Sequence, residues 1–203
     1  MAINELLNCA AECCDVVPVK HFARPEGDAA AIKMVVVSEA MPKRLDDYFY
    51  APGEPLFIKT TNMAFADAGY RFATYRDYLT NGIYLTTALK CRKKDYLASA
   101  ATVKNCAAVL AAELSQFPNV KVIMLMGDIA IQAVNHIWRV KYGIRAVPAG
   151  STYKIRAAVH ESAGVRFFPS YTQTGDSFGI EKSKRKMIAE DIAAALAVIG
   201  ASR

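Results

Sequence analysis

The stretch KMVVVSEA, Lys33–Ala40, decides the fold class, because a run of β-branched residues is typical of a strand buried on both faces. Further apolar strands are predicted at GIYLTTALKC (82–91), VKVIMLMG (120–127) and VRFFPSY (165–171). Helical patterns alternate with these strands, and the longest are found at 99–117, 128–143 and 183–200. Strands that alternate with helices predict a parallel sheet covered by helices on both faces.

The composition bounds the class of protein. The chain has 203 residues, which fits a single domain over residues 1–203. Its formal net charge of +6 favours a polyanionic partner such as nucleic acid. The sequence has no apolar run of the ~18 residues that a membrane span needs, and its first residues do not resemble a signal peptide, so we expect a cytoplasmic protein. Five cysteines in a reducing compartment indicate metal binding or simple burial.

The sequence has two basic clusters. One follows the end of the second predicted strand, and the other lies at the start of the last predicted helix. In a parallel sheet, ligands bind at the carboxyl ends of the strands, and we expect both clusters at that edge. The first consists of Lys90, Arg92, Lys93 and Lys94, and the second of Lys182, Lys184, Arg185 and Lys186. A positive rim on this edge predicts contacts with phosphates, and the alternative is two solvated helix starts.

The cysteines form two groups. Cys91 ends a predicted strand and Cys106 lies in the helix that follows, with fourteen residues between them. Cys9, Cys13 and Cys14 share the helical pattern near the N-terminus. Thiolates from two such places can close a four-cysteine site for an iron–sulfur cluster or zinc. Buried thiols on alanine-rich helices explain the same pattern equally well.

Four motifs in this order resemble those of the uracil-DNA glycosylase superfamily, and most of all its iron–sulfur branch, called family four. They are VVVSEAMP, IYLTTALKC, VIMLMGDIAIQAV and FFPSYTQTG. The resemblance covers nearly the whole chain. It implies a three-layer α/β/α sandwich with a central four-stranded parallel sheet. It also implies a role in base excision repair, in which a deaminated base, uracil or a related one, is flipped from DNA and its N-glycosidic bond is hydrolysed.

The resemblance implies a role for several residues. Glu39 matches the family's acidic position, where a carboxylate orients water, and Ser38 precedes it in the base-binding motif. Thr87 stands where the family has the asparagine that reads uracil. Thr172 stands where the family has a catalytic histidine, and in an alternative register Phe168 takes that place. Aromatic residues of the loop after the first strand are candidates for stacking on the flipped base: Phe49, Tyr50 and Phe57.

The replaced asparagine and histidine leave two expectations for function. One is a glycosylase with an altered pocket, and the other is a member that binds DNA or another ligand without excising a base. Where DNA is the ligand, we expect its backbone to pass the first basic cluster together with Lys184 and Arg185.

The resemblance also implies a 4Fe-4S cluster. Cys91 and Cys106 match one pair of the family's ligands, and Cys14 matches one member of the N-terminal pair. The other member falls on Ala11, so Cys9 or Cys13 must substitute, and a set that uses both Cys9 and Cys13 is equally consistent. We expect the cluster to tie the N-terminal segment to the second strand.

Overall fold

The computed structural model describes residues 3, 13, 15–19, 25–95, 98–179 and 181–201. The strands are β1 (Val16–Val17), β2 (Met34–Met41), β3 (Ile83–Lys93), β4 (Val122–Met126), β5 (His160–Ser162) and β6 (Val165–Ser170). The α-helices are α1 (Leu56–Asp67), α2 (Tyr75–Thr80), α3 (Ala100–Leu114), α4 (Asp128–Tyr142), α5 (Thr152–Ile155) and α6 (Lys182–Ile199). Short 3-10 helices lie at Ala29–Ala31, Leu45–Asp47 and Asp176–Gly179.

The strands form one six-stranded sheet with the order β1-β3-β2-β4-β6-β5. The four central strands are parallel, as the sequence predicts, and the short strands β1 and β5 pair antiparallel with β3 and β6 at the two edges. From β2 the chain continues to β3 on one side and then crosses to β4 on the other side. A crevice at the carboxyl ends of the strands is expected where the strand order switches in this way.

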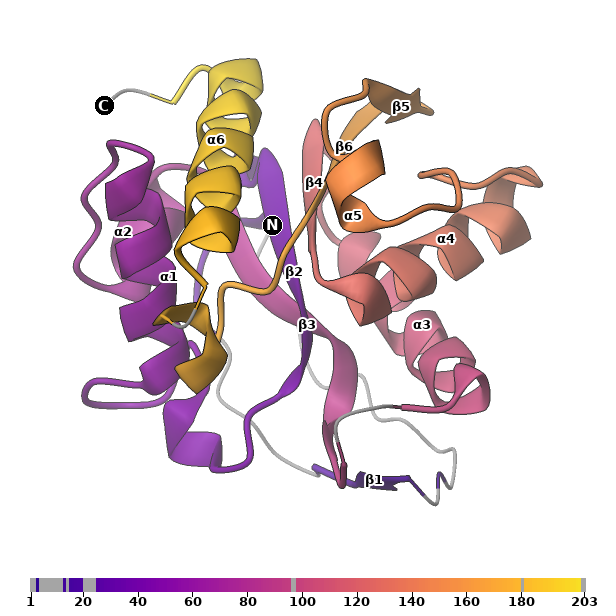
Figure 1. Ribbon diagram of the computed structural model, residues 1–203, viewed down its shortest axis with the longest axis horizontal. Coiled ribbons are helices and arrows are strands. Elements are labelled where there is room, and N and C mark those ends of the chain that lie inside the picture. The colour runs from indigo at the N-terminus through magenta and orange to yellow at the C-terminus, as the bar shows by residue number, and fades with distance from the viewer. Residues whose placement is uncertain are drawn as a thin grey trace.

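Helices cover both faces of the sheet. Figure 1 shows α1, α2 and α6 on one face and α3 and α4 on the other. The predicted three-layer α/β/α arrangement is therefore confirmed. Among the described residues, none of the helices combines the length and the apolar character that a membrane span requires.

The core lies where the two middle strands are covered on both faces. Val35, Val36 and Val37 of β2 are at most 1% exposed, and β4 is buried along its whole length. Burial on both faces explains why these strands are continuous apolar runs rather than alternating ones.

Local capping signals mark the starts of two helices, α3 and α2. The Ser99 hydroxyl accepts a hydrogen bond of 3.2 Å from the Thr102 N–H, which confirms the predicted start of α3. Helix α2 was not predicted from the sequence, although Thr74 and Asp77 form a capping box at its start. The helical pattern that carries Cys9, Cys13 and Cys14 lies outside the described residues, apart from Cys13.

Candidate active site

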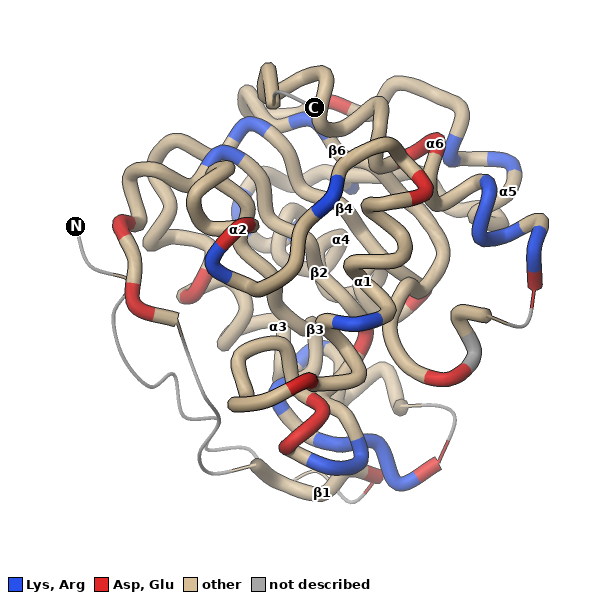
Figure 2. The backbone as a smooth tube through the Cα atoms, turned by 90° about the vertical axis from the view of Figure 1, so that its left-hand side faces the viewer, with Lys and Arg blue, Asp and Glu red and all other residues tan. Residues whose placement is uncertain are grey.

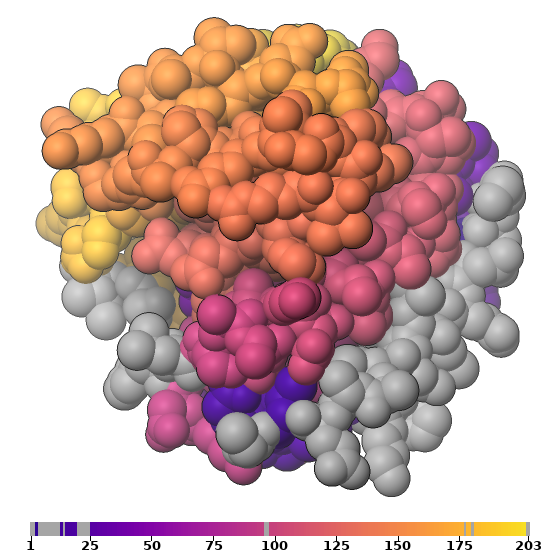
Figure 3. Space-filling view, turned by 90° about the vertical axis from the view of Figure 1, so that its right-hand side faces the viewer, coloured from indigo at the N-terminus to yellow at the C-terminus, as the bar shows by residue number. Residues whose placement is uncertain are grey.

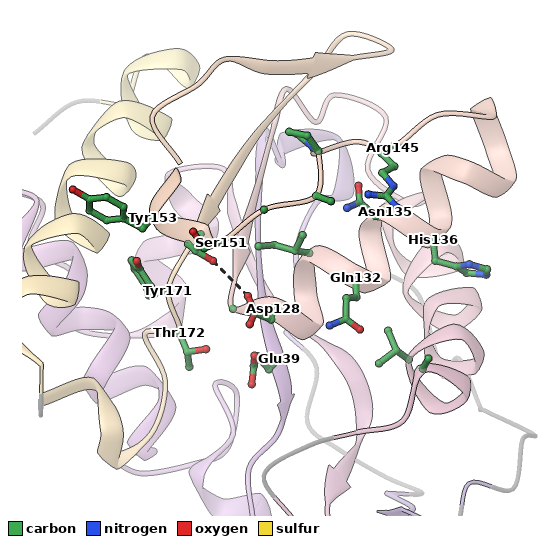
Figure 4. Close-up of a pocket in the computed structure, with 18 of the residues that line it drawn as sticks. Glu39, Asp128, Gln132, Asn135, His136, Arg145, Ser151, Tyr153, Tyr171 and Thr172 are labelled. Atoms are coloured by element: carbon green, nitrogen blue, oxygen red, sulfur yellow. Dashed lines mark hydrogen bonds between the residues drawn. The ribbon is translucent and has the colours of Figure 1, made fainter. Parts of the chain in front are cut away.

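A cleft opens at the carboxyl ends of the central strands, as expected from the switch in strand order. Glu39 lies near the end of β2, Gly127 directly follows β4, and Thr172 follows β6. These residues line part of a cavity of about 980 Å³. Figure 4 shows Glu39 and Thr172 side by side at this cavity, below the start of α4.

Gly127 allows the two side chains to meet. Its φ of +107° lies in a region that favours glycine. A Cβ atom at this position would lie 2.5 Å from the Thr172 hydroxyl and 2.6 Å from Glu39 Oε1. No side chain fits between them, so glycine is required for this arrangement.

Two contacts orient the Glu39 carboxylate. Its Oε2 atom accepts a hydrogen bond of 3.0 Å from Lys93 Nζ, and its Oε1 atom accepts one of 3.4 Å from the Ile129 N–H. The second donor belongs to the first turn of α4, where the helix dipole attracts negative charge. The side chain is 23% exposed, so water reaches a carboxylate whose direction is fixed by the fold.

The Thr172 hydroxyl is held weakly. It donates a hydrogen bond of 3.3 Å to the Met126 carbonyl, at the end of β4. The strand that leads to Thr172 is anchored more firmly, because Ser170 donates a 2.6 Å hydrogen bond to the buried Asp191 carboxylate of α6. Arg156 forms an ion pair of 2.7 Å with that carboxylate. Burial nevertheless raises the pKa of Asp191.

The candidate base-binding residues Thr87 and Ser38 are buried in the protein and do not line the cavity. Thr87 is fully buried, and its hydroxyl donates a 2.9 Å hydrogen bond to the Leu89 carbonyl of its own strand. Ser38 is also fully buried and pairs with the side-chain amide of Gln173, with contacts of 3.0 and 3.3 Å. The sequence did not indicate Gln173 as a site residue. Its amide fills the space next to the strand ends.

The candidate stacking residues pack into the core. Phe57 is 7% exposed, and its ring centroid lies 5.3 Å from that of Phe49. The Tyr50 hydroxyl donates a 2.7 Å hydrogen bond to the Leu85 carbonyl and accepts one of 3.0 Å from the Leu85 N–H. Burial raises the pKa of this phenol. The structure therefore places the three rings in an aromatic cluster under the loop, and not in the cleft.

Lys90 of the first basic cluster is inside the protein. It is 2% exposed and forms a 2.5 Å ion pair with Glu113 of α3, which is 1% exposed. Glu113 also accepts hydrogen bonds of 3.0 Å from Tyr84 and 2.9 Å from Thr86. The expectation that Lys90 contacts DNA is corrected by this placement, because a phosphate outside the protein does not reach a buried and paired amine.

The rest of the first cluster differs from residue to residue. Arg92 donates a 3.0 Å hydrogen bond to the Lys43 carbonyl, Lys93 pairs with Glu39, and Lys94 is exposed. Figure 2 shows the basic segment at the end of β3 beside β1. Of the cluster, Lys93 is the residue that the structure brings to the cleft.

The second cluster flanks the start of α6. Lys184 pairs with Glu181 at 2.7 Å and lies over the Tyr171 ring, 5.5 Å from its centroid. Arg185 pairs with Asp67 at the end of α1, with one contact of 2.8 Å. Lys184 lines the cavity, whereas Arg185 links two helices of the same layer.

The described cysteines gather near the end of β3. Cys91 and Cys106 are buried, and a hydrogen bond from the Cys106 thiol lowers the pKa of Cys91 to about 6. Cys13 accepts a 3.5 Å hydrogen bond from Asn105, the neighbour of Cys106 on α3. Two other predicted ligands, Cys9 and Cys14, lie outside the described residues. Within the described part of the chain, no group of three His, Cys, Asp or Glu side chains is arranged to hold a metal ion.

One wall of the cavity was not recognised in the sequence. It is formed by one face of α4, and its polar members are Asp128, Gln132, Asn135, His136 and Arg139. The segment between α4 and α5 contributes Arg145 and Ser151, and α5 contributes Thr152 and Tyr153. The spacing of the polar residues in DIAIQAVNHIWR was the available signal, because such residues three and four apart lie on one face of a helix.

One comparison with known protein families gives a match. The sequence model of the uracil DNA glycosylase superfamily matches residues 22–189. The matched range contains β2, β3, β4 and β6, together with the loops that carry the residues of the cleft. No curated protein matches the chain.

Proposed function

The chain belongs to the uracil DNA glycosylase superfamily, and from this premise we propose that it excises a deaminated base, uracil or a related one, from DNA. The base is flipped out of the helix and its N-glycosidic bond is hydrolysed. Glu39 and Thr172 act on the reacting atoms in this proposal. The loss of the family's asparagine and histidine motifs makes the chain a divergent member, whose pocket differs from that of uracil-reading relatives.

One observation carries the proposal. A carboxylate from β2 and a hydroxyl from the loop after β6 meet over Gly127, at the edge of an open cavity. These groups come from distant parts of the sequence, positions 39 and 172. Their convergence at a glycine that tolerates no side chain supports a shared chemical task.

The two groups suit the hydrolysis of a glycosidic bond. Glu39 accepts a proton from a water molecule, whose oxygen forms a bond to C1′ of the sugar. The bond between C1′ and the base nitrogen breaks, and its electron pair leaves with the base. The Thr172 hydroxyl donates a hydrogen bond to the base where negative charge develops. Its present bond to Met126 is long enough, at 3.3 Å, to be exchanged readily.

Glu39→Gln tests the proposal on oligonucleotides that contain uracil, hypoxanthine or xanthine. Alkaline cleavage of the abasic product measures excision of the base. We expect the wild-type chain to excise at least one of these bases, and Glu39→Gln to lower the rate about 10²-fold or more, because the amide does not accept the proton. Glu161→Gln is the matched control, since Glu161 is exposed on β5, away from the cleft.

The outcomes separate the parts of the proposal. A wild-type chain that leaves all three bases in place would contradict the excision of these bases. An active chain that tolerates Glu39→Gln would contradict only the role of Glu39. Equal losses in Glu39→Gln and Glu161→Gln would point to a general effect on the fold and not to a role of Glu39 in the reaction.

A second candidate function is supported by the buried residues beside the cleft. The hydroxyls of Ser38 and Thr87 already have partners inside the protein, and Gln173 occupies the space next to them. A base that is read at this depth would have to displace these contacts. The alternative is therefore a superfamily member that binds DNA without excising a base, and the same oligonucleotides distinguish the two by product formation against binding alone.

We also propose that the chain belongs to the iron–sulfur branch of the superfamily and binds a 4Fe-4S cluster. Cys91 and Cys106 would supply two thiolates, and the remaining ligands would come from Cys9, Cys13 and Cys14. The chemistry of Cys91 suits this role, because a thiolate is the form that binds iron and the pKa of Cys91 is lowered to about 6. Such a cluster would tie the N-terminal segment to β3 and α3.

Iron content tests the cluster directly. Anaerobically purified wild-type chain is expected to contain about four iron atoms and to show the visible absorbance of a cluster, and Cys91→Ser is expected to lack both. The stability supplies the matched comparison. Cys91→Ser and iron-free wild type should melt at similar temperatures, and both should melt below the loaded wild type. Iron bound at equal levels in Cys91→Ser and wild type would exclude Cys91 as a ligand.

A further inference from the structure

The cavity extends beyond Glu39 as a groove along α4. The lining residues of this helix run from Asp128 to Arg139 with helical spacing. The eleven steps from Asp128 to Arg139, at a rise of 1.5 Å each, give the wall a length of about 16 Å. A stacked strand of nucleic acid, which rises about 3.4 Å per nucleotide, covers this distance in about five nucleotides. The groove is thus longer than one flipped nucleotide needs.

The charge changes sign along the groove. Glu39 and Asp128 are acidic and lie at the end where α4 begins. Three further cations line the cavity: Arg139 near the end of α4, Arg145 on the segment that follows α4, and Lys104 on α3. Within the described part of the chain, the side chains of these three residues are exposed and form no hydrogen bond or ion pair. They can therefore bind phosphates without first breaking an internal contact.

The loop that carries Arg145 is fixed on α4. The Asn135 amide donates a 3.0 Å hydrogen bond to the Val147 carbonyl and accepts one of 2.9 Å from the Val147 N–H. Val147 itself is fully buried. Figure 4 shows Arg145 and Asn135 close together at this end of the cavity. A cation on an anchored loop loses less conformational freedom when it binds than one on a loose loop.

An exposed aromatic ring completes the groove. Tyr153 of α5 is 69% exposed and lines the same cavity. In Figure 4 it lies on the side of the cavity opposite Arg145. Figure 3 shows the outer surface of this region, with α4, α5 and their connection in orange above α3 in magenta. Cations and an exposed aromatic ring that line one cavity are a combination that binds single-stranded nucleic acid, because the ring stacks on an unpaired base while the cations contact the backbone.

We propose that this groove binds a single strand of DNA next to the reacting nucleotide. We call it the α4 groove and define it by Lys104, His136, Arg139, Arg145 and Tyr153. The three cations contact backbone phosphates, and Tyr153 stacks on a base. Lys104, Arg139 and Arg145 mark the part of the groove that binds phosphates, and the sugar of the reacting nucleotide lies near Glu39. The inference rests on the proposed function in that DNA is taken as the ligand.

Binding of an oligonucleotide without any deaminated base tests the α4 groove separately from excision. A labelled single strand is titrated with the full chain at several salt concentrations, and the affinity is read by fluorescence anisotropy. The variant Lys104→Gln/Arg139→Gln/Arg145→Gln should weaken binding about 10- to 100-fold at low salt. Its plot of log Kd against log salt should lose about 2 in slope, because three phosphate contacts at about 0.7 each are removed.

The triple variant and a test variant of the ring, Tyr153→Ala, each have a matched control. Lys33→Gln/Arg71→Gln/Lys121→Gln removes the same charge from exposed residues away from the cavity and should change the affinity less than twofold. Tyr153→Ala should weaken binding about tenfold without changing the salt slope. Tyr142→Ala should have little effect, because Tyr142 is also exposed but lies outside the cavity.

Three results would overturn the inference: equal losses in the two triple variants, an unchanged affinity in the groove variant, or tighter binding of the matching duplex through the same residues. Excision with unchanged binding in the groove variant would reject the α4 groove alone. Groove-dependent binding without any excision would support the α4 groove and reject the proposed glycosylase activity.

Discussion

Lys90→Met is expected to lower the free energy of unfolding by about 3–5 kcal/mol, because it leaves the Glu113 carboxylate buried without its cation. Tyr84 and Thr86 continue to donate to Glu113, but hydroxyls do not neutralise its charge. For a chain of this size the loss corresponds to a fall in melting temperature of roughly 6–20 °C. Urea denaturation, followed by circular dichroism, measures the free energy directly.

An exposed pair of the same residue types is the matched control for Lys90. Lys59 and Glu54 form an ion pair of 2.8 Å at the surface, with side chains 55% and 79% exposed. Lys59→Met should change the stability by less than about 1 kcal/mol. The double variant Lys90→Met/Glu113→Leu should regain much of the loss, since it removes both buried charges. A Lys90→Met chain as stable as Lys59→Met would show that Glu113 is not charged or not buried in solution.

Gly127→Ala is expected to lower the rate of base excision at least 10²-fold, as much as the loss of Glu39 itself. The added methyl group would occupy the place where the Thr172 hydroxyl and the Glu39 carboxylate meet, at 2.5 and 2.6 Å. One or both side chains must move away. The φ of +107° adds backbone strain of about 1–3 kcal/mol. Excision assays and thermal melts on the same preparation measure the two effects.

Gly53→Ala separates the strain at Gly127 from the steric conflict. Gly53 has a φ of +84°, and a Cβ atom there meets no atom within 4 Å. This variant should be destabilised to a similar extent but should keep its excision rate. If Gly127→Ala keeps full activity as well, the meeting of Glu39 and Thr172 has no role in the reaction.

The sequence predicted the framework well because the signals for it are local. The buried runs of β2 and β4 and the serine cap of α3 each depend on a few neighbouring residues. The edge of the sheet at which Glu39 and Thr172 lie follows from the alternation of strands and helices alone. Their convergence over Gly127 required the register of β2, β4 and β6 as well, which the sequence does not state.

Lys90 shows why the surface was harder to predict. The basic run suggested one exposed patch, but β3 continues to Lys93 and keeps Lys90 on the face that packs against α3. On a strand, alternate residues share a face, so Thr86 and Lys90 both meet Glu113. Glu113 itself gave a signal that can be recognised in retrospect. It lies three residues after Leu110 on the apolar face of α3, where a carboxylate needs a buried partner.

The α4 groove depends on contacts that no local pattern predicts. Its wall is a regular amphipathic face, but its basic end exists because Asn135 binds the backbone at Val147 and so fixes the loop that carries Arg145. An asparagine in a helix has many possible partners. Only the folded chain shows that this one anchors the loop.

The contact between Tyr50 and Leu85 has a consequence for association between molecules. Strand β3 borders on β1 only at Arg92 and Lys93, so the outer edge of its buried part is not paired with a strand in the described sheet. An open edge of this kind is a template on which another chain can add a strand. The Tyr50 phenol binds both the N–H and the carbonyl of Leu85, which are groups that an incoming strand would use. A single side chain thus occupies the backbone groups in the middle of this edge and blocks the addition of a strand there.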